Sequence, residues 1–550
     1  MKHLFMVALA ATLNLVFFPG YTQNVLPTVD DTLRGSVTPE RSWWDLQYYH
    51  LSINVRPESK SVSGTVAVHY KVIDPSQILQ IDLQPPLSIT SVTQDNQAVT
   101  FEKKGKNAYM IRLTKTQQPG RAESVMITYS GKPIEAKNPP WQGGFQWAYD
   151  KEGMAFIATS CQGLGASVWW PCKDHMYDEP DSMLMSVTTP AKLTDVSNGR
   201  LRKTTMNPDG TKTFDWFVTN PINNYGVNVN IANYEHFADT LHGEQGVLDI
   251  DYYVLPHNLE KAKEQFKQVK PMLKAFEYWF GPYPFYEDGY KLVEVPYLGM
   301  EHQSSVTYGN GYQNGYLGHD ASGSGWGLKW DFIIIHESGH EWFANNITYR
   351  DIADMWIHEG FTNYSETLYT EYHFGKNAGN EYCYGTRKGI ANDRPIIGIY
   401  NFNKRGSGDM YPKAGNMLHT IRHSIDNDKL FREILRGMNK TFRHQTVTTA
   451  QIENYISEKA GFDYSKVFDQ YLRTVRIPIL EYSIDKNTVT YRWSNVVEGF
   501  NLPLVLRNGS SVIRLLPTEK WQTVKVKDSQ KTLIDELAIE KMYYVDVRPR

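Results

Sequence analysis

Residues 336–340 read His-Glu-Ser-Gly-His, and this pentapeptide constrains the fold of the 550-residue chain more tightly than any other segment. On a helix, residues four apart lie on the same face, so His336 and His340 can both direct an imidazole nitrogen at one metal ion. Glu337 projects beside them, close enough to take a proton from a water molecule held by that metal. The pentapeptide also arises by chance on surface helices, so a metal site needs a further ligand.

A second predicted helix, residues 356–366, offers that ligand. It contains Glu359, 19 positions after His340. Two histidines and one glutamate form the ligand set that leaves the fourth position of zinc open, so the sequence predicts one zinc ion. Glu366, two turns further along the same face, is either a carboxylate that supports these ligands or a solvated surface residue. His358 points about 100° away from Glu359 and is predicted to be packed rather than a ligand.

The spacing of apolar residues divides the chain into three parts. Apolar and polar residues alternate from about Tyr49 to Ile250, which indicates an antiparallel β domain. From Leu259 the pattern is helical, and the first predicted helix runs to Phe280. We therefore predict a multidomain α+β fold, with a β domain over residues 24–255, a mostly helical domain over 256–475 and a small β domain over 476–550.

Two local signals support these assignments. Thr448 followed by Gln451 has the spacing of a capping box, which predicts the start of a helix. After Pro478 the alternation returns, and Asn508-Gly509 has the composition of a hairpin turn between two strands. The helical part is therefore expected to end before the last β domain begins.

The composition excludes several classes of protein. The chain has 57 Lys and Arg against 60 Asp and Glu, a formal net charge of −3, so it lacks the basic character typical of nucleic-acid binding. Apolar residues make up 41% and aromatic residues 13%, which excludes a disordered chain. Three cysteines are too few for a disulfide framework.

The N-terminal residues have the pattern of a signal peptide. A short basic start is followed by a mostly apolar stretch from Leu4 to Gly20, and we assign residues 1–23 to the signal peptide. The alternative is an uncleaved membrane anchor. No later segment reaches about 18 consecutive apolar residues, so we expect no membrane insertion of the mature chain. The expected location is periplasmic or secreted.

The metal motif with Glu359 resembles the gluzincin aminopeptidase family of zinc metallopeptidases, which includes aminopeptidase N and leukotriene hydrolase. Residues 280–284 are similar to the family's F-G-x-Y-P turn. The resemblance implies a saddle-like antiparallel β domain, a thermolysin-like and mostly helical catalytic domain with one zinc ion, and a small C-terminal β-sandwich. The chain resembles a bacterial-type short form without the family's large helical C-terminal domain.

The segment from Leu298 to His302 resembles the family's G-x-M-E-N sequence, in which the glutamate holds the α-amino group of the substrate. The resemblance implies that role for Glu301, with Gly299 and Met300 as further substrate-binding residues. Leu298 and His302 depart from the family's first glycine and its asparagine.

Residues 159–174 resemble the leukotriene-hydrolase branch, in which a glutamine also binds the amine. That role falls on Gln162. The branch carries an arginine where this chain has Ser167. Cys161 and Cys172 belong to the same pattern and are predicted to be free thiols rather than a disulfide.

Residues 410–415 resemble the family's Y-x-K-G-A helix start, whose tyrosine stabilises the tetrahedral intermediate. The resemblance implies that role for Tyr411. The pair Ala414-Gly415 inverts the family's glycine and alanine, which affects helix packing more than the direction of the tyrosine.

Together these residues predict a zinc-dependent aminopeptidase that releases N-terminal amino acids from peptides with a free amine. Glu337 is the expected base, Tyr411 the second catalytic residue, and Glu301 with Gln162 the amine anchor. Two alternatives stay open. A thermolysin-type zinc endopeptidase shares the zinc ligands but lacks the amine anchor, and an inactive binding protein would have lost part of the site. The oligomeric state and the preferred N-terminal residue do not follow from the sequence.

Overall fold

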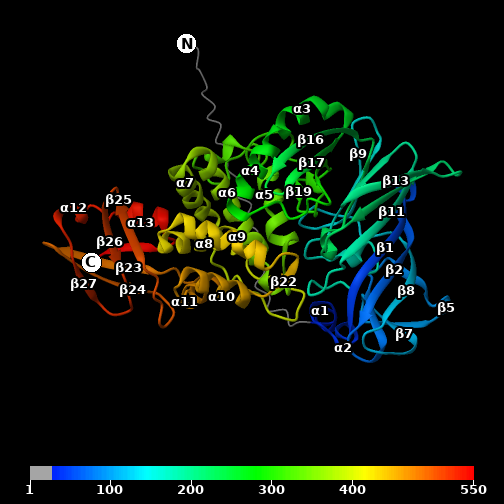
Figure 1. Cartoon of the computed structure of the whole chain (residues 1–550), viewed down its shortest axis with the longest axis horizontal. Coiled ribbons are helices and arrows are strands. Elements are labelled where there is room, and N and C mark those ends of the chain that lie inside the picture. Colours follow the sequence, from blue (N-terminus) through cyan, green and yellow to red (C-terminus); the bar gives the residue numbers. More distant parts are fainter. Residues whose placement is uncertain (1–27) are drawn as a thin grey trace, which may run out of the picture.

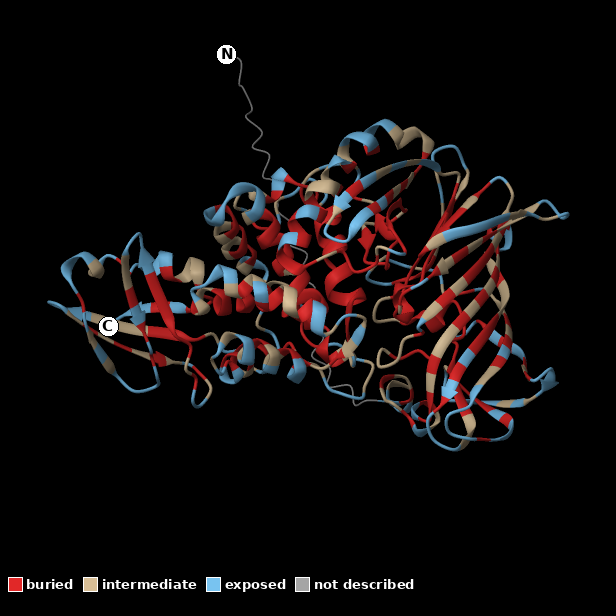
Figure 2. Ribbon diagram, viewed as in Figure 1, coloured by how far each residue is buried: buried red, intermediate tan, exposed pale blue. Residues whose placement is uncertain are grey.

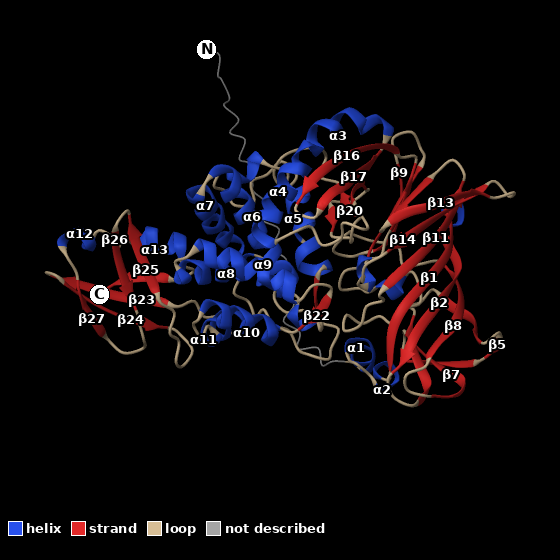
Figure 3. Ribbon diagram, in the orientation of Figure 1, coloured by secondary structure: helices blue, strands red, loops and turns tan. Residues whose placement is uncertain are grey.

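The computed structural model describes residues 28–550, so the predicted signal peptide lies outside the described part of the chain. Figure 1 shows an elongated molecule with a β-rich N-terminal part at one end, helices in the middle and a small β part at the other end. Figure 3 shows strands concentrated at the two ends and helices between them. The predicted multidomain α+β fold is confirmed.

The N-terminal part is built around an eight-stranded sheet in the order β13-β14-β11-β1-β2-β8-β4-β5. In β1 nearly every second residue is buried, so the alternation in the sequence reflects one face packed on a core. Neighbouring strands are antiparallel, except that β1 and β11 run parallel, which the prediction of an antiparallel domain did not include. The strands are β1 (Trp44–Arg56), β2 (Ser61–Val72), β4 (Ser88–Gln94), β5 (Gln97–Ala98), β8 (Ala122–Gly131), β11 (Ser182–Pro190), β13 (Arg200–Met206) and β14 (Thr211–Val218).

Two smaller sheets and two short helices complete this part. A three-stranded sheet has the order β3-β7-β6, and a four-stranded sheet has the order β12-β15-β10-β9. The residue after β10 is Cys161, so the four-stranded sheet leads directly to Gln162. The elements are α1 (Val29–Gly35), α2 (Pro39–Ser42), β3 (Ser76–Asp82), β6 (Thr100–Lys104), β7 (Ala108–Gln117), β9 (Gly144–Tyr149), β10 (Ala155–Ser160), β12 (Thr194–Ser197) and β15 (Val229–Ala232).

A five-stranded sheet in the order β16-β17-β18-β20-β19 crosses the predicted boundary between residues 255 and 256. Its strands are β16 (Glu235–Gly243), β17 (Gly246–Val254), β18 (Tyr290–Glu294), β19 (Gly299–Met300) and β20 (Val306–Tyr308). β17 pairs in parallel with β18, beginning at Ile250 opposite Tyr290. A sheet buries its apolar face as one unit. We therefore propose that the central domain begins in the connection between Ala232 and Glu235.

The central part is mostly helical. The predicted helix from Leu259 to Phe280 is divided into α3 and α4 by a tight turn at Phe266–Gln268, because Pro271 has no backbone N–H and favours the first turn of a new helix. The helices are α3 (Leu259–Gln265), α4 (Val269–Phe280), α5 (Phe332–Gly339), α6 (Trp356–Phe374), α7 (Lys376–Thr386), α8 (Pro412–Ile425), α9 (Asp428–Thr441), α10 (Thr449–Ala460) and α11 (Ser465–Arg473), with the short strands β21 (Ile347–Tyr349) and β22 (Gln445–Val447) beside them.

Burial is greatest at the centre of the molecule. Figure 2 shows buried residues gathered in the central helices and on the inner faces of the sheets. The core of the central helices is continuous with that of the C-terminal strands. A second core fills the N-terminal part, and Met300 at the end of β19 packs into it. The two cores therefore meet at β19, next to Glu301.

The C-terminal part contains a four-stranded sheet, β27-β24-β23-β28, and the hairpin β25-β26. The predicted hairpin is confirmed, with its two-residue turn one position later, at residues 509–510, because Asn508 ends β25 and pairs with Ser511 and Gly509 has a φ of 58°. The O–H of Tyr543 donates to the carbonyl of His423, which ties this part to α8. The elements are β23 (Ile479–Asp485), β24 (Thr488–Ser494), β25 (Leu504–Asn508), β26 (Ser511–Leu515), β27 (Gln522–Lys525), α12 (Asp528–Lys531), α13 (Glu536–Met542) and β28 (Asp546–Pro549).

The prediction on membrane insertion concerns the helices of the described residues. Within residues 28–550, no helix combines the length and the apolar composition needed to cross a bilayer.

Cys161, Cys172 and Cys383 are all buried free thiols. The prediction of free thiols at the first two positions is therefore confirmed.

The start of α10 provides a test of the local stability of the fold. Thr448 and Gln451 form the predicted capping box, in which each side chain accepts a hydrogen bond from the other residue's backbone N–H. Thr448→Ala should destabilise the first turn by about 1 kcal/mol, because the backbone N–H of Gln451 loses its side-chain acceptor. Thr448→Ser keeps the hydroxyl and is the matched control. Native-state hydrogen exchange of the α10 amides measures the difference, and equal protection in both variants would contradict the role of the cap.

Candidate active site

The helix that carries His336 and Glu337 begins at a buried cap. Asp331 precedes α5, and its Oδ1 accepts the backbone N–H groups of Ile333 and Ile334 at 3.1 and 3.4 Å. A capped first turn fixes where the helix starts and therefore which side each later residue faces. The helical prediction for the pentapeptide is confirmed up to Gly339, and His340 follows with helical backbone angles.

Two glycines allow α5, α6 and α8 to approach closely. A Cβ on Gly339 would lie 2.6 Å from Oγ of Ser365 in α6. A Cβ on Gly360 in α6 would lie 2.6 Å from Cβ of Ala414 in α8. Both distances are shorter than any real carbon contact, so a larger residue at either position would push the helices apart. This packing brings Glu359 to the histidines.

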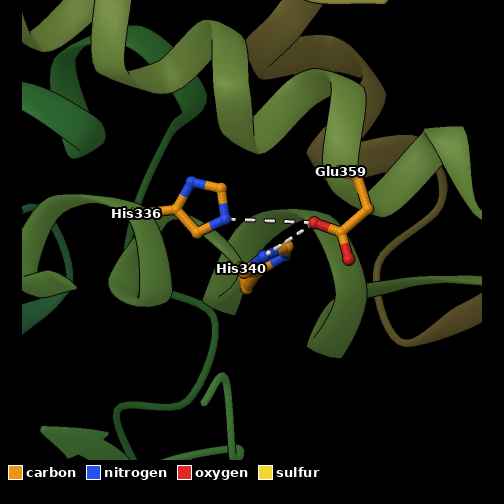
Figure 4. A group of neighbouring side chains, drawn as sticks. All are labelled: His336, His340 and Glu359. Carbon is orange, nitrogen blue, oxygen red and sulfur yellow. Dashed lines mark ion pairs between the residues drawn. The ribbon is translucent and has the colours of Figure 1, made fainter. Parts of the chain in front are cut away.

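The side chains of His336, His340 and Glu359 converge on one point, as Figure 4 shows. Oε2 of Glu359 lies 3.4 Å from Nε2 of His340 and 3.9 Å from Nε2 of His336. Donor atoms around a tetrahedral zinc ion are about 3.3 Å apart, given Zn–N and Zn–O bonds of about 2.0–2.1 Å. All three side chains are buried. The three predicted ligands are therefore brought together at the spacing that one small ion requires.

The hydrogen bonds of the three residues leave their inward atoms free. Nδ1 of His336 lies 2.7 Å from Oε1 of Glu366, and Nδ1 of His340 lies 3.0 Å from the carbonyl oxygen of Phe343. These oxygens only accept, so each Nδ1 carries the hydrogen and each Nε2 keeps its lone pair. Oε2 of Glu359 is buried without a hydrogen-bond partner among the described residues. The donor set therefore fits a zinc ion.

Glu366 supports this centre from the far side of His336. Its Oε1 accepts from Nδ1 of His336, and its Oε2 accepts the O–H of Tyr382 at 2.6 Å. The sequence left Glu366 as either a supporting carboxylate or a solvated surface residue. Its side chain is fully buried, so it is not a surface glutamate. Tyr382 comes from α7 and was not predicted, because no local pattern distinguishes it from the other tyrosines of the chain.

The predicted amine anchor lies next to the metal donors. Nε2 of Gln162 donates to Oε1 of Glu301 at 2.6 Å and to Oε1 of Glu359 at 2.8 Å. Glu301, Glu337 and His340 also have side-chain atoms within 4.8 Å of one another. A loop of the N-terminal part and a strand end of the central part therefore meet at this point. The arrangement gathers the carboxylates of Glu301 and Glu359 around the amide group of Gln162.

The strand before Glu301 packs directly on the metal helix. β19 consists of Gly299 and Met300, and a Cβ on Gly299 would lie 2.6 Å from Cγ2 of Ile333. A larger residue would therefore separate the strand from α5. Leu298 and His302, which depart from the family pattern, do not prevent this contact. His302 is buried, and its Nε2 has no partner among the described residues.

Electrostatics suit Glu337 to proton transfer. Burial, with a further contribution from the charge of Glu301, raises the pKa of Glu337 to about 7 against the opposing effect of His336. A carboxyl group with a pKa near neutrality can both accept and release a proton. Burial, followed by the charges of Glu359 and Glu301, raises the pKa of Tyr411 well above its usual value. Tyr411 is therefore a neutral phenol, whose O–H can donate a hydrogen bond.

His358 is packed, as the sequence predicts, and faces away from the metal donors. The backbone N–H of Tyr349 donates to Nε2 of His358 at 2.8 Å, so the lone pair of that nitrogen is occupied. Its Nδ1 lies 3.2 Å from the hydroxyl of Tyr225. Neither nitrogen is available to a metal ion.

The metal donors, the predicted amine anchor, Glu337 and Tyr411 line one cavity of about 320 Å³. Every site residue predicted from the sequence is among its walls: Gln162, Gly299, Met300, Glu301, His336, Glu337, His340, Glu359, Glu366 and Tyr411. The walls also include Trp141, Phe332, Tyr382 and Arg405, which the sequence did not identify. No short motif contains these four residues, so only the fold could reveal them.

Comparison with known proteins agrees with the family resemblance seen in the sequence motifs. The family profile described as "Peptidase M1 N-terminal domain" matches residues 46–225, and that described as "Peptidase family M1 domain" matches residues 264–471. A probable aminopeptidase 2 of Sulfurisphaera tokodaii is 22% identical over 84% of this chain and 59% of its own length. Aminopeptidase N of Lactococcus lactis is 22% identical over 80% of this chain and 52% of its own length. The chain thus spans little more than half the length of these relatives.

Solved structures show the same fold. An M1 zinc metallopeptidase from Deinococcus radiodurans aligns with a TM-score of 0.66 at 20% identity, over 80% of this chain and 95% of that one. A mutant of the same enzyme with a Tyr-Ser-Ala substrate aligns with a TM-score of 0.65 over 79% of this chain. Together the two profile matches take in more than half of the chain, from the first sheet to the helices behind the metal donors, and the chain therefore belongs to peptidase family M1.

Proposed function

We propose that this protein is a zinc-dependent aminopeptidase that releases N-terminal amino acids from peptides. The observation that carries the proposal is the pair Glu301 and Gln162, which lies in contact with the metal donor Glu359. A cationic amine bound there puts the first peptide bond of a substrate next to the metal donors. Cleavage is then limited to the bond after the first residue. The names of the relatives, several of them aminopeptidases, agree with this assignment.

His336, His340 and Glu359 would hold the zinc ion. When bound, zinc supplies a Lewis acid that polarises the carbonyl of the scissile peptide bond. Glu366 and the carbonyl of Phe343 fix the two imidazole rings through their Nδ1 hydrogens. These contacts orient both Nε2 atoms before any ion arrives, which lowers the cost of binding it.

Glu337 is proposed as the general base. Its carboxylate accepts the proton of the attacking water molecule and returns it to the nitrogen of the leaving amine. The raised pKa of Glu337 supports both steps, because a group with a pKa near 7 exchanges protons readily at neutral pH. Its carboxylate lies within 4.8 Å of a ring nitrogen of the metal ligand His340, which places it within reach of the same bond.

Tyr411 is proposed to stabilise the transition state. Its side chain lines the same cavity as the metal donors, and its neutral O–H can donate to the oxygen that becomes negative as water attacks. One such donor contributes roughly 3–4 kcal/mol to the transition state. Gly299 and Met300 are proposed to support the substrate backbone along β19, which leads into Glu301.

Two rival functions are less well supported. A thermolysin-type endopeptidase needs a cleft open on both sides of the scissile bond, yet Glu301 and Gln162 occupy the side where preceding residues would lie. An inactive binding protein would lack a ligand or the base, yet each of these residues is present and oriented. The proposed substrates are peptides with a free N-terminal amine. On the pattern of residues 1–23 alone, we also propose export to the periplasm or the medium.

Cleavage of blocked and free substrates tests the proposed function. The zinc-loaded protein should hydrolyse an aminoacyl anilide with a free amine and not its N-acetylated form, and a zinc chelator should stop the reaction. Glu301→Gln removes the carboxylate that binds the ammonium group and should lower kcat/KM for free-amine substrates by about 100-fold. Glu433→Gln, an exposed change on α9, is the control. Equal cleavage of both substrate forms would show an endopeptidase instead.

The base is tested by a change that keeps the shape of its side chain. Glu337→Gln should keep a full complement of zinc, since His336, His340 and Glu359 remain. Its kcat should fall by about 10²–10⁴-fold, because no carboxylate takes the proton from water. Metal analysis and steady-state kinetics on the same sample separate the two effects. Substantial residual turnover would place the base elsewhere.

Metal binding is tested without reference to activity. Adding zinc to metal-free protein should raise its Tm, because an ion bound only by the folded state stabilises it by about 4 kcal/mol at 1,000 times Kd. Glu359→Gln should remove most of this shift. Glu366→Gln keeps all three ligands and should weaken zinc binding only by about 10–100-fold. If both variants bound zinc as the unchanged protein does, the proposed centre would be wrong.

A further inference from the structure

A second cavity, of about 590 Å³, adjoins the site cavity. The two share Trp141, Gln162 and Arg405 as walls. The second cavity is bounded by the loop before β9, the loop after β10 and the loop that precedes Tyr411. It contains none of the metal donors. It is therefore a separate space that opens from the site beside Gln162.

The position of this space relative to the amine anchor indicates what enters it. Gln162 contacts Glu301 on one side and lines the second cavity on the other. In a peptide, the side chain of the first residue leaves the Cα atom that carries the ammonium group. When that ammonium group is held by Glu301 and Gln162, the second cavity is the open space that adjoins the site cavity on the Gln162 side.

The walls of the second cavity carry an excess of positive charge. Lys137, Lys404 and Arg405 are all exposed residues of its lining. The one carboxylate of the lining, Glu135, is paired with Lys60 at 2.8 Å and so offsets little of that charge. Within the described part of the chain, Arg405 has neither a carboxylate nor a hydrogen-bond acceptor as a partner. An unpaired guanidinium group at the junction of two cavities is available to a ligand.

The remaining walls suit a short acidic side chain. Trp141 is 61% exposed at the junction, and Ile134, Leu164, Ile352 and Met355 provide apolar surface. Apolar walls accommodate the methylene groups of glutamate or aspartate, and the guanidinium group of Arg405 can bind the carboxylate with two parallel hydrogen bonds.

We propose that the second cavity receives the side chain of the N-terminal residue of the substrate, and that Arg405 selects a carboxylate there. Peptides that begin with glutamate or aspartate are then preferred over those that begin with the uncharged amides. The inference rests on the proposed aminopeptidase function and adds its substrate class. Arg405 is a specificity-determining residue in this assignment.

A carboxylate at Arg405 has a second conceivable source, the C-terminus of a short peptide. The leaving part of a substrate extends past Glu337 toward Phe332, Tyr382 and Thr386, on walls of the site cavity that the second cavity does not share. Arg405 belongs to the shared walls beside the amine anchor. The geometry therefore favours the side chain of the first residue.

The decisive measurement compares isosteric anilides in the zinc-loaded, full-length protein. The ratio of kcat/KM for glutamyl anilide over glutaminyl anilide should be about tenfold, as expected for a charge-assisted hydrogen bond. Arg405→Gln should bring the ratio close to one, Arg405→Lys should restore part of it, and Arg405→Glu should favour lysyl over glutamyl anilide. Arg121→Gln, which removes an exposed charge from the distant start of β8, should leave the ratio unchanged.

Each other outcome overturns the inference in a distinguishable way. A ratio of one or less in the unchanged protein, or a ratio that Arg405→Gln does not alter, contradicts the assignment while the aminopeptidase function stands. If Arg405→Gln lowers kcat/KM only for Ala-Ala-Ala relative to its C-terminal amide, the guanidinium group binds the C-terminal carboxylate of the peptide, which also contradicts the inference. Failure of the zinc-loaded protein to cleave any free-amine anilide contradicts the proposed function itself, and the inference with it.

Discussion

The close packing of α5 on α6 is the contact on which the rest of the site depends. Gly339 leaves just enough room for α6, and the hydrogen bond from His336 to Glu366 joins the two helices through their side chains. Glu359 then reaches the histidines with one buried oxygen unpartnered. Leaving such an atom without a partner costs folding free energy, which a bound cation would return. Stability and metal binding are therefore linked at this interface.

The site also depends on a contact between the N-terminal part and the central part. Gln162 follows the last residues of β10, whereas Glu301 follows β19, and their side chains meet at 2.6 Å. Met300 packs into the N-terminal core, which holds the two parts in register at this point. The proposed amine anchor therefore forms only in the assembled molecule, and the same junction opens into the cavity beside Arg405. In the proposed function, both the peptide bond that is cleaved and the first side chain that is preferred depend on this one interdomain contact.

The site also concentrates negative charge. Glu301, Glu337 and Glu359 are buried in one cavity, and burial, with a smaller contribution from repulsion between carboxylates, raises the pKa of the first two. Carboxylates in such a position are costly unless cations accompany them. A metal ion, the ammonium group of a substrate and the nearby guanidinium of Arg405 are the cations that this arrangement can use. The near-neutral charge of the whole chain hides this local imbalance.

The sequence by itself determined the metal helix, its ligands and the alternating strands, because helical and strand periodicity place residues of short spacing on known faces. The capping box at Thr448 belongs to this class. Glu359, which lies on a second helix 19 residues after His340, was predicted from the ligand set that zinc requires, and the family resemblance extended the prediction to Glu301. Only the tertiary structure decided that β16 and β17 join the central sheet, that Tyr382 holds Glu366, and that Arg405 stands beside the amine anchor. These contacts join segments far apart in the chain, and no local spacing encodes them. They depend on how whole sheets and helices pack.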